Sequence, residues 1–490
     1  MFSQIKIVAQ QAGNNVALRG DAHSYSYNEL VSSVENLAHE LKQFKRQTVA
    51  LYIDKCPEWI VIDLACQVAD IKLLPLPAFF SDLQLKHAAK EAGASAVIHL
   101  RGDRLSQLLE LQHGSDICGQ FIISTTGINP ARLPDQTAKI TFTSGSTGEP
   151  KGVCLSNEQQ LSVATALQSM VSLNGSKHLA LLPFSTLLEN VAGVYLTLLS
   201  GGSVLALSQQ TMGFNGSSGL NIDTLLRTIN VHQPNSLIVL PELLLALVKS
   251  IENGWQAPSS LEFIAVGGSK VSPTLLSKAK QLGLPVYEGY GLSECSSVVS
   301  LNTNVKEKIG SVGKPLEHVS VQVDDGEVLV SGNTFLGYVN QPETWGQKLL
   351  ATGDLGYLDD DGYLFIDGRK KNLLISSFGR NINPEWVESS MLSNGLLKQC
   401  VVFGDAKPFC IALFYPFNTS VSTADVQHWV TSVNDTLPDY AQIQKWHMLS
   451  NPLTVQAGLL TANGRPKRHA IHEAYQTKID AFYDVKLQET

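Results

Sequence analysis

The sequence lacks the features that mark several protein classes. Its seven cysteines are scattered without a C-x-x-C pair, which argues against a disulfide framework or a zinc site. No sustained lysine or arginine block accompanies the net charge of −8, so nucleic acid is not expected as a partner. The longest apolar region, residues 179–207, is interrupted by Pro183, Glu189 and Asn190, so we expect no transmembrane segment. The first residues show no basic region followed by an apolar core, and with reduced thiols this predicts a cytoplasmic protein.

What is present is the composition of an ordinary globular protein. The chain has 490 residues, 44% of them hydrophobic and 16% charged, which suggests about three domain-sized units. Ser26 and Glu29 form a capping-box pattern before a helix, residues 49–53 read as a strand, and residues 57–68 read as the next helix. The alternation resumes with strands at 235–240 and 262–266. This rhythm predicts parallel sheets covered by helices.

From about Gly310 the chain changes to short strands and turns. Asp325-Gly326 separates apolar strands at 319–323 and 327–330, which is a hairpin pattern. A further unit of about 120 residues follows residues 368–371. We therefore expect an α/β fold with a large N-terminal domain of helix-covered sheets plus a small β-structure, followed by a small α+β C-terminal domain.

One segment, residues 140–152, indicates a polyphosphate site. It reads as a buried strand that runs into a loop of hydroxyls and glycines, with Lys151 adding a mobile positive charge. The hydroxyl residues are Thr143, Ser144, Ser146 and Thr147, and the glycines are Gly145, Gly148 and Gly152. The loop is not a Walker site, because Pro150 and Gly152 stand where that motif needs glycine and a hydroxyl. A flexible surface turn is the alternative, which the preceding strand and Lys151 disfavour.

Four further segments carry candidate functional residues. They are residues 287–294, Thr352-Gly-Asp354, residues 368–371 and residues 461–468. The glycines of the first segment permit a tight turn that presents Tyr290 and Glu294. Taken singly, each segment has a simpler explanation: Asp354 as a turn residue, Arg369 as a solvated charge, Glu294 as a helix cap, and residues 461–468 as a solvated basic run.

The order and spacing of these segments together resemble the adenylate-forming superfamily of acyl-CoA synthetases, adenylation domains and firefly-type luciferases. The resemblance covers nearly the whole chain. It implies a large N-terminal domain over residues 1–368 with the ATP and acyl sites, a hinge at 369–371, and a small domain over 372–490 that rotates between half-reactions.

The resemblance also implies a role for each candidate residue. Residues 143–151 would hold the β- and γ-phosphates of ATP, and Thr147 and Glu294 would hold Mg²⁺ and act in catalysis. Asp354 would accept the ribose hydroxyls beside Arg369. The walls around the adenine and the rest of the cofactor set would be Gly267, Gly268, Ser269, Glu288, Gly289, Tyr290, Gly291 and Ser293. Lys371 would be the hinge, and Gly379 would let pantetheine pass close to the backbone.

Residues 182–190 are closest to the long-chain acyl-CoA synthetase branch, which implies a fatty acid or similar apolar carboxylate. Two departures stand out. Thr186 occupies a position where that branch commonly has histidine, and the C-terminal motif has Arg465 where the family has its catalytic lysine. Arginine keeps the positive charge but not the geometry of an ammonium group. We expect Arg465 to take the catalytic role, with Lys467 as the alternative.

The implied reaction activates a carboxylate to acyl-AMP and pyrophosphate, and then transfers the acyl group to the thiol of coenzyme A. An acyl-AMP ligase that loads the phosphopantetheine of a separate acyl carrier protein is a second possibility, and a luciferase-like monooxygenase a distant third. A protein of another class, which binds nucleotide or acyl groups without turnover, is supported only by the change at Arg465. An apolar substrate is compatible with weak peripheral membrane contact.

Overall fold

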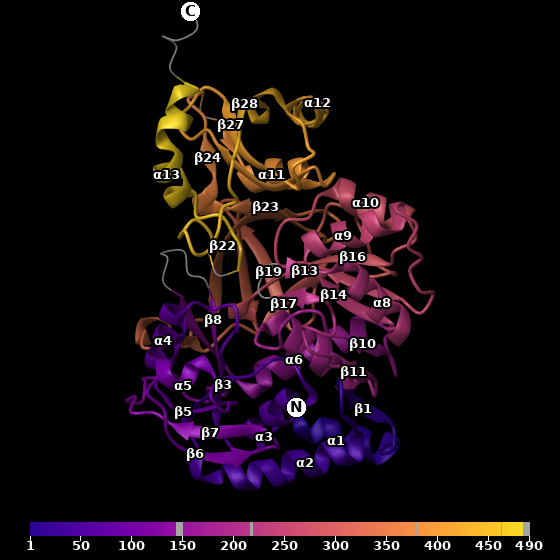
Figure 1. Ribbon diagram of the computed structural model, residues 1–490, viewed down its shortest axis with the longest axis vertical. Helices are drawn as coiled ribbons and strands as arrows, with labels where there is room; N and C mark the ends of the chain where they lie inside the picture. The colour runs from indigo at the N-terminus through magenta and orange to yellow at the C-terminus, as the bar shows by residue number, and fades with distance from the viewer. Residues whose placement is uncertain (144–149, 216–218, 379, 462, 484–490) are drawn as a thin grey trace, which may run out of the picture.

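The computed structural model describes residues 1–143, 150–215, 219–378, 380–461 and 463–483. Two large sheets and a smaller one form the body of the molecule, and a separate C-terminal unit lies at the opposite end from the N-terminal helices α1 and α2 (Figure 1). Among these described residues, no helix is long and apolar enough to cross a membrane.

The first large sheet has the strand order β21-β9-β8-β4-β3-β5-β7-β6. β3 pairs in parallel with β4 and β5, and β4 with β8, whereas the β5–β7, β6–β7, β8–β9 and β9–β21 pairs are antiparallel. The strands are β3 (Thr48–Tyr52), β4 (Lys72–Pro75), β5 (Ala94–Leu100), β6 (Gln112–Ile117), β7 (Phe121–Thr125), β8 (Lys139–Thr143), β9 (Lys151–Leu155) and β21 (Gly337–Tyr338). The intervening helices are α3 (Pro57–Val68), α4 (Asp82–Glu91) and α5 (Arg104–Leu108).

The second large sheet has the order β18-β17-β16-β15-β14-β10-β11-β1-β2 and is parallel from β1 to β16. Its strands are β1 (Val16–Arg19), β2 (Ser24–Ser26), β10 (Lys177–Leu179), β11 (Ser203–Leu205), β14 (Ser236–Val239), β15 (Phe263–Val266), β16 (Val286–Leu292), β17 (Ser297–Leu301) and β18 (Lys314–Pro315). The helices of this part are α1 (Phe2–Ala12), α2 (Tyr27–Glu40), α6 (Asn157–Met170), a π-helix (Leu188–Tyr195), α7 (Leu196–Leu199), α8 (Ile222–His232), α9 (Pro241–Glu252) and α10 (Pro273–Gln281). Short pieces are the hairpin of β12 (Phe214–Asn215) and β13 (Gly219–Leu220) and the 3₁₀ turns Leu41–Phe44, Ser293–Cys295 and Pro342–Thr344.

A smaller antiparallel sheet, β19-β20-β22-β23, contains the predicted hairpin. Its strands are β19 (Val319–Asp324), β20 (Glu327–Gly332), β22 (Leu349–Leu358) and β23 (Leu364–Arg369). Asp325 and Gly326 both have positive φ, as a tight hairpin turn requires. In Figure 1 this sheet lies between the C-terminal unit and the first large sheet.

The C-terminal unit has hydrophobic clusters of its own, built from residues between Leu374 and Ile479. It contains β24 (Leu374–Ile375), β25 (Asn381–Ile382), β26 (Leu397–Phe403), β27 (Cys410–Pro416), β28 (Ile443–Met448), α11 (Pro384–Leu392), α12 (Thr423–Asn434) and α13 (Arg468–Ala481), with 3₁₀ turns at Lys370–Asn372 and Asp439–Ala441. The predicted fold class, with a large N-terminal domain and a smaller C-terminal one, is confirmed. The boundaries at 368 and 372 and the hinge stay predictions.

The structure also shows why the local predictions succeed. Ser26 caps α2, since its hydroxyl accepts from the Glu29 backbone while the Glu29 carboxylate accepts from the Ser26 N–H at 2.7 Å. The sheets are less uniformly parallel than the alternation predicted. Some antiparallel pairs, such as β8 with β9, join strands whose connection is too short for a crossover helix, whereas β21 pairs with β9 from a distant part of the chain.

Candidate active site

The predicted phosphate loop connects β8 to β9, and the two strands pair so that Thr143 lies opposite Lys151. The predicted residues Ser144, Gly145, Ser146, Thr147 and Gly148 lie outside the described residues. Gly152 lies just after the loop, where a Cβ would come 2.7 Å from the Val339 side chain and 3.0 Å from the Phe142 ring. A glycine is therefore needed for β9 to fit between its neighbours.

Glu294, the predicted metal ligand, lies in the 3₁₀ turn after β16 and accepts a hydrogen bond from the Tyr338 hydroxyl at 2.8 Å. Lys151 lies on the same tyrosine, with its Nζ 5.1 Å from the ring centroid. Burial and the charge of Glu294 raise the pKa of Tyr338, so its hydroxyl stays a donor. Tyr338 thus has a carboxylate at its hydroxyl and an ammonium against its ring.

Tyr338 was not predicted from the sequence. It lies 44 residues after Glu294, and only the antiparallel pairing of Tyr338 with Val153 of β9 brings it to the phosphate loop. No spacing rule signals such a contact, because it depends on which strand β21 joins.

Asp354, Tyr290 and Arg369 form one cluster, in which Asp354 is buried and the other two are partly exposed. Asp354 is 3% exposed, accepts from the Tyr290 hydroxyl at 2.5 Å and pairs with the Arg369 Nε at 2.8 Å. Arg369 lies opposite Asp354 in the β22–β23 ladder and also donates to the Thr352 carbonyl at 3.0 Å. Burial raises the pKa of Asp354, and the charge of Arg369 opposes that rise. The carboxylate is fixed in place, and each oxygen retains a lone pair for a further donor.

The Gly267–Ser269 loop follows β15 and lies against β16. A Cβ on Gly267 would be 2.9 Å from the Gly289 carbonyl, so the two backbones approach too closely for a side chain. The predicted Gly291 and Ser293 lie further along the same segment. Burial raises the pKa of Glu288 to about 8, against the charge of Lys270, so this carboxyl is largely protonated at neutral pH.

The C-terminal motif brings Arg465, and not Lys467, to this cluster. The Arg465 guanidinium donates to the Gly268 carbonyl, and its charge acts on the Asp354 carboxylate. Lys467 precedes α13, where its backbone N–H donates to Leu459 of its own unit at 2.9 Å. Lys371 is exposed at the start of the C-terminal unit. The predicted Gly379 lies outside the described residues.

The segment expected beside the acyl carboxylate is held by one buried carboxylate, Glu189. Glu189 pairs with His178 at 2.6 Å and accepts from the Leu182 N–H at 2.8 Å. The Thr186 hydroxyl donates to the Pro183 carbonyl at 2.7 Å, within its own turn. The segment continues into the π-helix Leu188–Tyr195, a form often found at functional sites.

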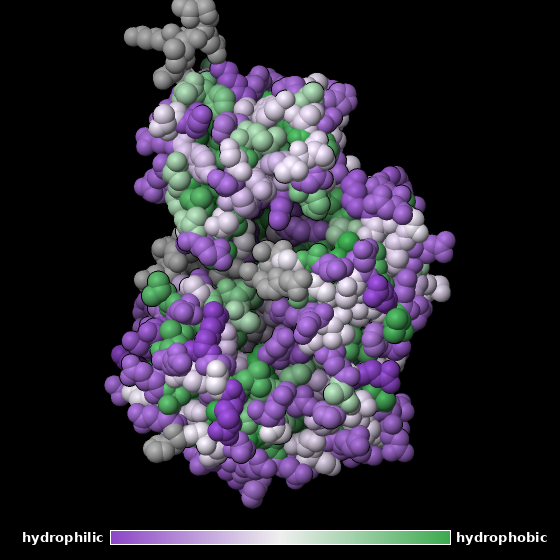
Figure 2. All heavy atoms as spheres, in the orientation of Figure 1, coloured by the Kyte–Doolittle hydropathy of each residue, from purple (hydrophilic) through white to green (hydrophobic). Residues whose placement is uncertain are grey.

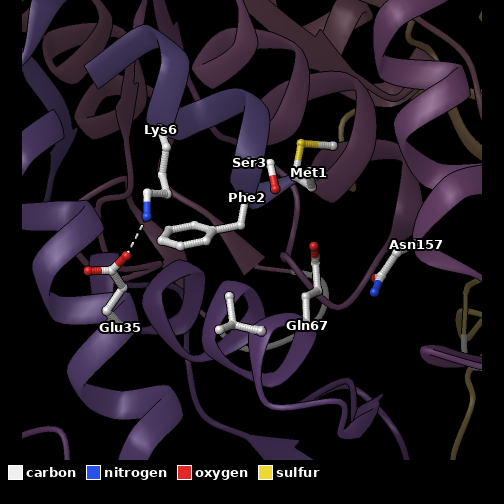
Figure 3. Close-up of a pocket in the computed structure, with 8 residues that line it drawn as sticks. Met1, Phe2, Ser3, Lys6, Glu35, Gln67 and Asn157 are labelled. Carbon is white, nitrogen blue, oxygen red and sulfur yellow. Dashed lines mark hydrogen bonds and ion pairs between the residues drawn. The ribbon is translucent and has the colours of Figure 1, made fainter. Parts of the chain in front are cut away.

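Two surface pockets lie away from this cluster. One, of about 410 Å³, is formed by Met1, by residues of α1, α2 and α3, and by Asn157 of α6, and Lys6 and Glu35 form an ion pair of 2.7 Å there (Figure 3). The other, of about 550 Å³, adjoins it and shares Gln67 and Asn157. Neither is lined by a predicted site residue.

The described residues contain no group of three or more histidine, cysteine or acidic side chains placed to hold a metal. A hard cation at this site would therefore take Glu294 and oxygens of a bound phosphate as ligands, which is the donor set that Mg²⁺ prefers. The remaining lone pairs of Glu294 fit that role, since Tyr338 engages only Oε1.

Comparisons with known proteins identify the family. Residues 5–339 match the model of the AMP-binding enzyme family, and residues 371–486 match that of the AMP-binding enzyme C-terminal domain. A 2-succinylbenzoate–CoA ligase of Bacillus pumilus is 27% identical over 423 residues, covering 79% of this chain and 82% of that protein. A long-chain-fatty-acid–CoA ligase, FadD15 of Mycobacterium bovis, is 26% identical over 531 aligned residues, covering 87% and 86%.

Among solved structures, the anthranilate CoA ligase AuaEII in complex with anthranoyl-AMP has a TM-score of 0.82 at 18% identity, covering 98% of both chains. The O-succinylbenzoate coenzyme A synthetase of Bacillus subtilis, in complex with ATP and magnesium ion, has a TM-score of 0.75 at 23% identity, covering 95% and 98%. At these identities the structures show a common fold. The two family models together span most of the chain, and the chain belongs to the AMP-binding enzyme family, as the resemblance of its motifs predicted.

Proposed function

We propose that this enzyme is an AMP-forming acid–thiol ligase. In the first step a carboxylate oxygen attacks the α-phosphorus of ATP, and the bond to the β-phosphate oxygen breaks to release pyrophosphate. In the second step a thiol, deprotonated on attack, forms a bond with the acyl carbon and AMP leaves. The observation that carries the proposal is the Asp354–Tyr290–Arg369 cluster, with Arg465 reaching across to Gly268 beside it.

Four residues of the site have a proposed role in the first step. Asp354 would accept the ribose hydroxyls, because its carboxylate is already fixed by Tyr290 and Arg369. Arg465 would place its remaining N–H donors on the carboxylate and α-phosphate, where negative charges meet. Lys151 would neutralise the outer phosphates. Mg²⁺, when bound with Glu294 and the predicted Thr147, would supply further charge neutralisation.

For the substrate we propose an apolar carboxylate, with a medium- or long-chain fatty acid as the first candidate. Residues 182–190 support it, as does the long-chain-fatty-acid–CoA ligase among the relatives. An aromatic acid is the second candidate, because other relatives are named 2-succinylbenzoate–CoA ligases. The proposed acceptor is coenzyme A, since the relatives are named CoA ligases, with a carrier-protein phosphopantetheine as the alternative.

A protein that binds nucleotide without turnover is disfavoured by the contact of Arg465 with Gly268. The substitution of lysine by arginine leaves a cation at the cluster rather than removing it. This contact also supports the assignment of the catalytic role to Arg465 over Lys467.

The test is a panel of fatty and aromatic acids incubated with ATP and Mg²⁺, with and without coenzyme A. Mass spectrometry would detect AMP, acyl-adenylate and acyl-thioester, and carboxylate-dependent pyrophosphate exchange would report the first step alone. We expect exchange without any thiol, and acyl-thioester only when coenzyme A is added. No AMP and no exchange with any acid would refute ligase activity, whereas transfer only to a phosphopantetheinylated carrier would favour the alternative acceptor.

A further inference from the structure

Helix α9 presents one stripe of residues away from its own core. Leu244, Leu247 and Val248 are buried in a hydrophobic cluster of the large unit. Glu242, Leu245 and Lys249 lie three and seven residues apart, so they share another face of the helix. Leu245 is half-buried there, while Glu242 and Lys249 are exposed.

The C-terminal unit rests on this stripe. Gly395, in the turn between α11 and β26, lies so close that a Cβ on it would be 3.3 Å from the Lys249 Cε and 3.7 Å from a Leu245 methyl. Figure 1 shows α9 and α10 on the side of the large unit that faces α11, and Figure 2 shows the surface hollowed where the two parts meet. The turn at Gly395 is therefore in close contact with α9, and a larger side chain at 395 would have to displace the Lys249 side chain.

A second contact joins another part of the C-terminal unit to the loop that follows β15. The Arg465 guanidinium donates to the Gly268 carbonyl. The charges of Glu385, Asp354 and Glu242 act on the exposed Arg465 guanidinium and favour its charged form, against the repulsion of Arg369. Glu242 therefore attracts the arginine from the start of α9, while Leu245 and Lys249 support Gly395 along the helix.

We propose that the Glu242–Leu245–Lys249 stripe of α9 is a docking seat for the C-terminal unit that positions Arg465 at the Gly267–Ser269 loop. Glu242, Leu245, Lys249 and Gly395 are positioning residues, because they act on the reaction only through Arg465. The inference rests on the proposed function, in which Arg465 serves the adenylation step. Because Gly395 has φ +77°, its backbone tolerates few side chains, and the test needs a control with the same strain.

Gly458 provides that control, because it has φ +74° in the same unit and a Cβ added to it would meet nothing within 4 Å. Gly395→Lys places bulk and a like charge against Lys249, whereas Gly458→Lys carries only the backbone strain. We expect Gly395→Lys to lower the rate of pyrophosphate exchange about 100-fold, since small displacements of a catalytic group have effects of that order. Gly458→Lys should stay within about twofold of wild type, with the same unfolding midpoint in both variants.

Three further variants separate docking from general damage. Lys249→Glu combined with Gly395→Lys replaces the repulsion by an ion pair and should restore most of the exchange rate. Arg465→Ala combined with Gly395→Lys should be no slower than Arg465→Ala alone, because the seat acts through that arginine. Glu242→Lys, an exposed charge reversal that does not alter the turn, should lower exchange about tenfold.

Hydrogen exchange at the α9 amides gives a readout that does not need turnover. We expect faster exchange of these amides in Gly395→Lys and Glu242→Lys than in wild type or Gly458→Lys. If the wild-type protein showed no pyrophosphate exchange, that result would count against the proposed function. Hydrogen exchange of the α9 amides would still decide whether the docking seat exists. The docking seat would be overturned if Gly395→Lys and Glu242→Lys both kept wild-type rates of amide hydrogen exchange and of pyrophosphate exchange. It would also be overturned if the losses of Gly395→Lys and Arg465→Ala were additive in the double variant.

Discussion

Removing the hydroxyl of Tyr338 tests whether Glu294 is oriented for a metal. In Tyr338→Phe the ring remains, so its contact with Lys151 and its edge-on packing against Phe335, at 4.8 Å between centroids, are kept. Only the 2.8 Å hydrogen bond to Glu294 is lost. A hydrogen bond to a charged group contributes about 1.5–3 kcal/mol, which corresponds to roughly 10- to 150-fold in an equilibrium constant.

The assay is a Mg²⁺ titration of carboxylate-dependent pyrophosphate exchange at saturating ATP. We expect the apparent Mg²⁺ affinity of Tyr338→Phe to fall by about 10- to 100-fold, as for other residues that orient a metal ligand, while the rate at saturating Mg²⁺ falls less. Tyr357→Phe is the matched control, because Tyr357 is exposed on β22 and stacks on Phe365. An unchanged Mg²⁺ requirement, or an equal change in the control, would refute the orienting role of Tyr338.

Three other predictions concern charges in and beside the cluster. Arg465→Ala should lower the exchange rate by about 100-fold or more, and Lys467→Ala should leave it near wild type; the reverse result would transfer the role to Lys467. Burial raises the pKa of Glu288 to about 8, above its value of about 4.3 in the unfolded chain. Between these two values the native state keeps a proton that the unfolded chain has lost, so the protein loses stability as the pH rises from about 4.3 to about 8. Glu288→Gln removes this loss, and thermal melts from pH 5 to pH 9 should show its unfolding temperature rising relative to wild type up to about pH 8 and then levelling. The Arg468 guanidinium donates to Glu388 through two contacts of 2.6 Å. Glu388→Gln removes its charge partner, and urea unfolding should show that the free energy of unfolding falls by about 3 kcal/mol. An unchanged free energy of unfolding would mean that the pair is solvated.

The elements that could be predicted are those set by local chemistry. Ser26 with Glu29, and Ser81 before α4, are capping signals read over four residues, and both form as capping boxes. Pro57 begins α3 for a similar reason, because its fixed φ suits the first turn of a helix. Asp325-Gly326 determines a hairpin by the positive φ that its turn requires. In each case the residues that decide the structure are neighbours in the sequence.

The contacts that could not be predicted depend on strand order. β21 has two residues and joins β9, and this pairing alone places Tyr338 between Lys151 and Glu294. The buried group of Asp63, Lys139, Asn190 and Tyr195 is likewise drawn from α3, β8 and the π-helix, with Lys139 2.9 Å from Asp63. Lys139 lies 56 residues from Tyr195 in the sequence, and Asp63 lies 127 residues from Asn190. Their chemistry was visible in the sequence, but their partners were not.

The structure adds to the C-terminal motif the contact that Arg465 makes. From the sequence alone, Arg465 was the expected catalyst in place of lysine, and a protein without turnover was an alternative supported only by this change. In the structure the guanidinium uses Nη2 on the Gly268 carbonyl, which leaves its other N–H groups to reach a carboxylate and a phosphate together, since a guanidinium carries five donors in a planar fork. A lysine bonded to the same carbonyl would have two donors left on a single nitrogen. In the proposed reaction the substitution would therefore change the direction from which charge is offered, not its presence.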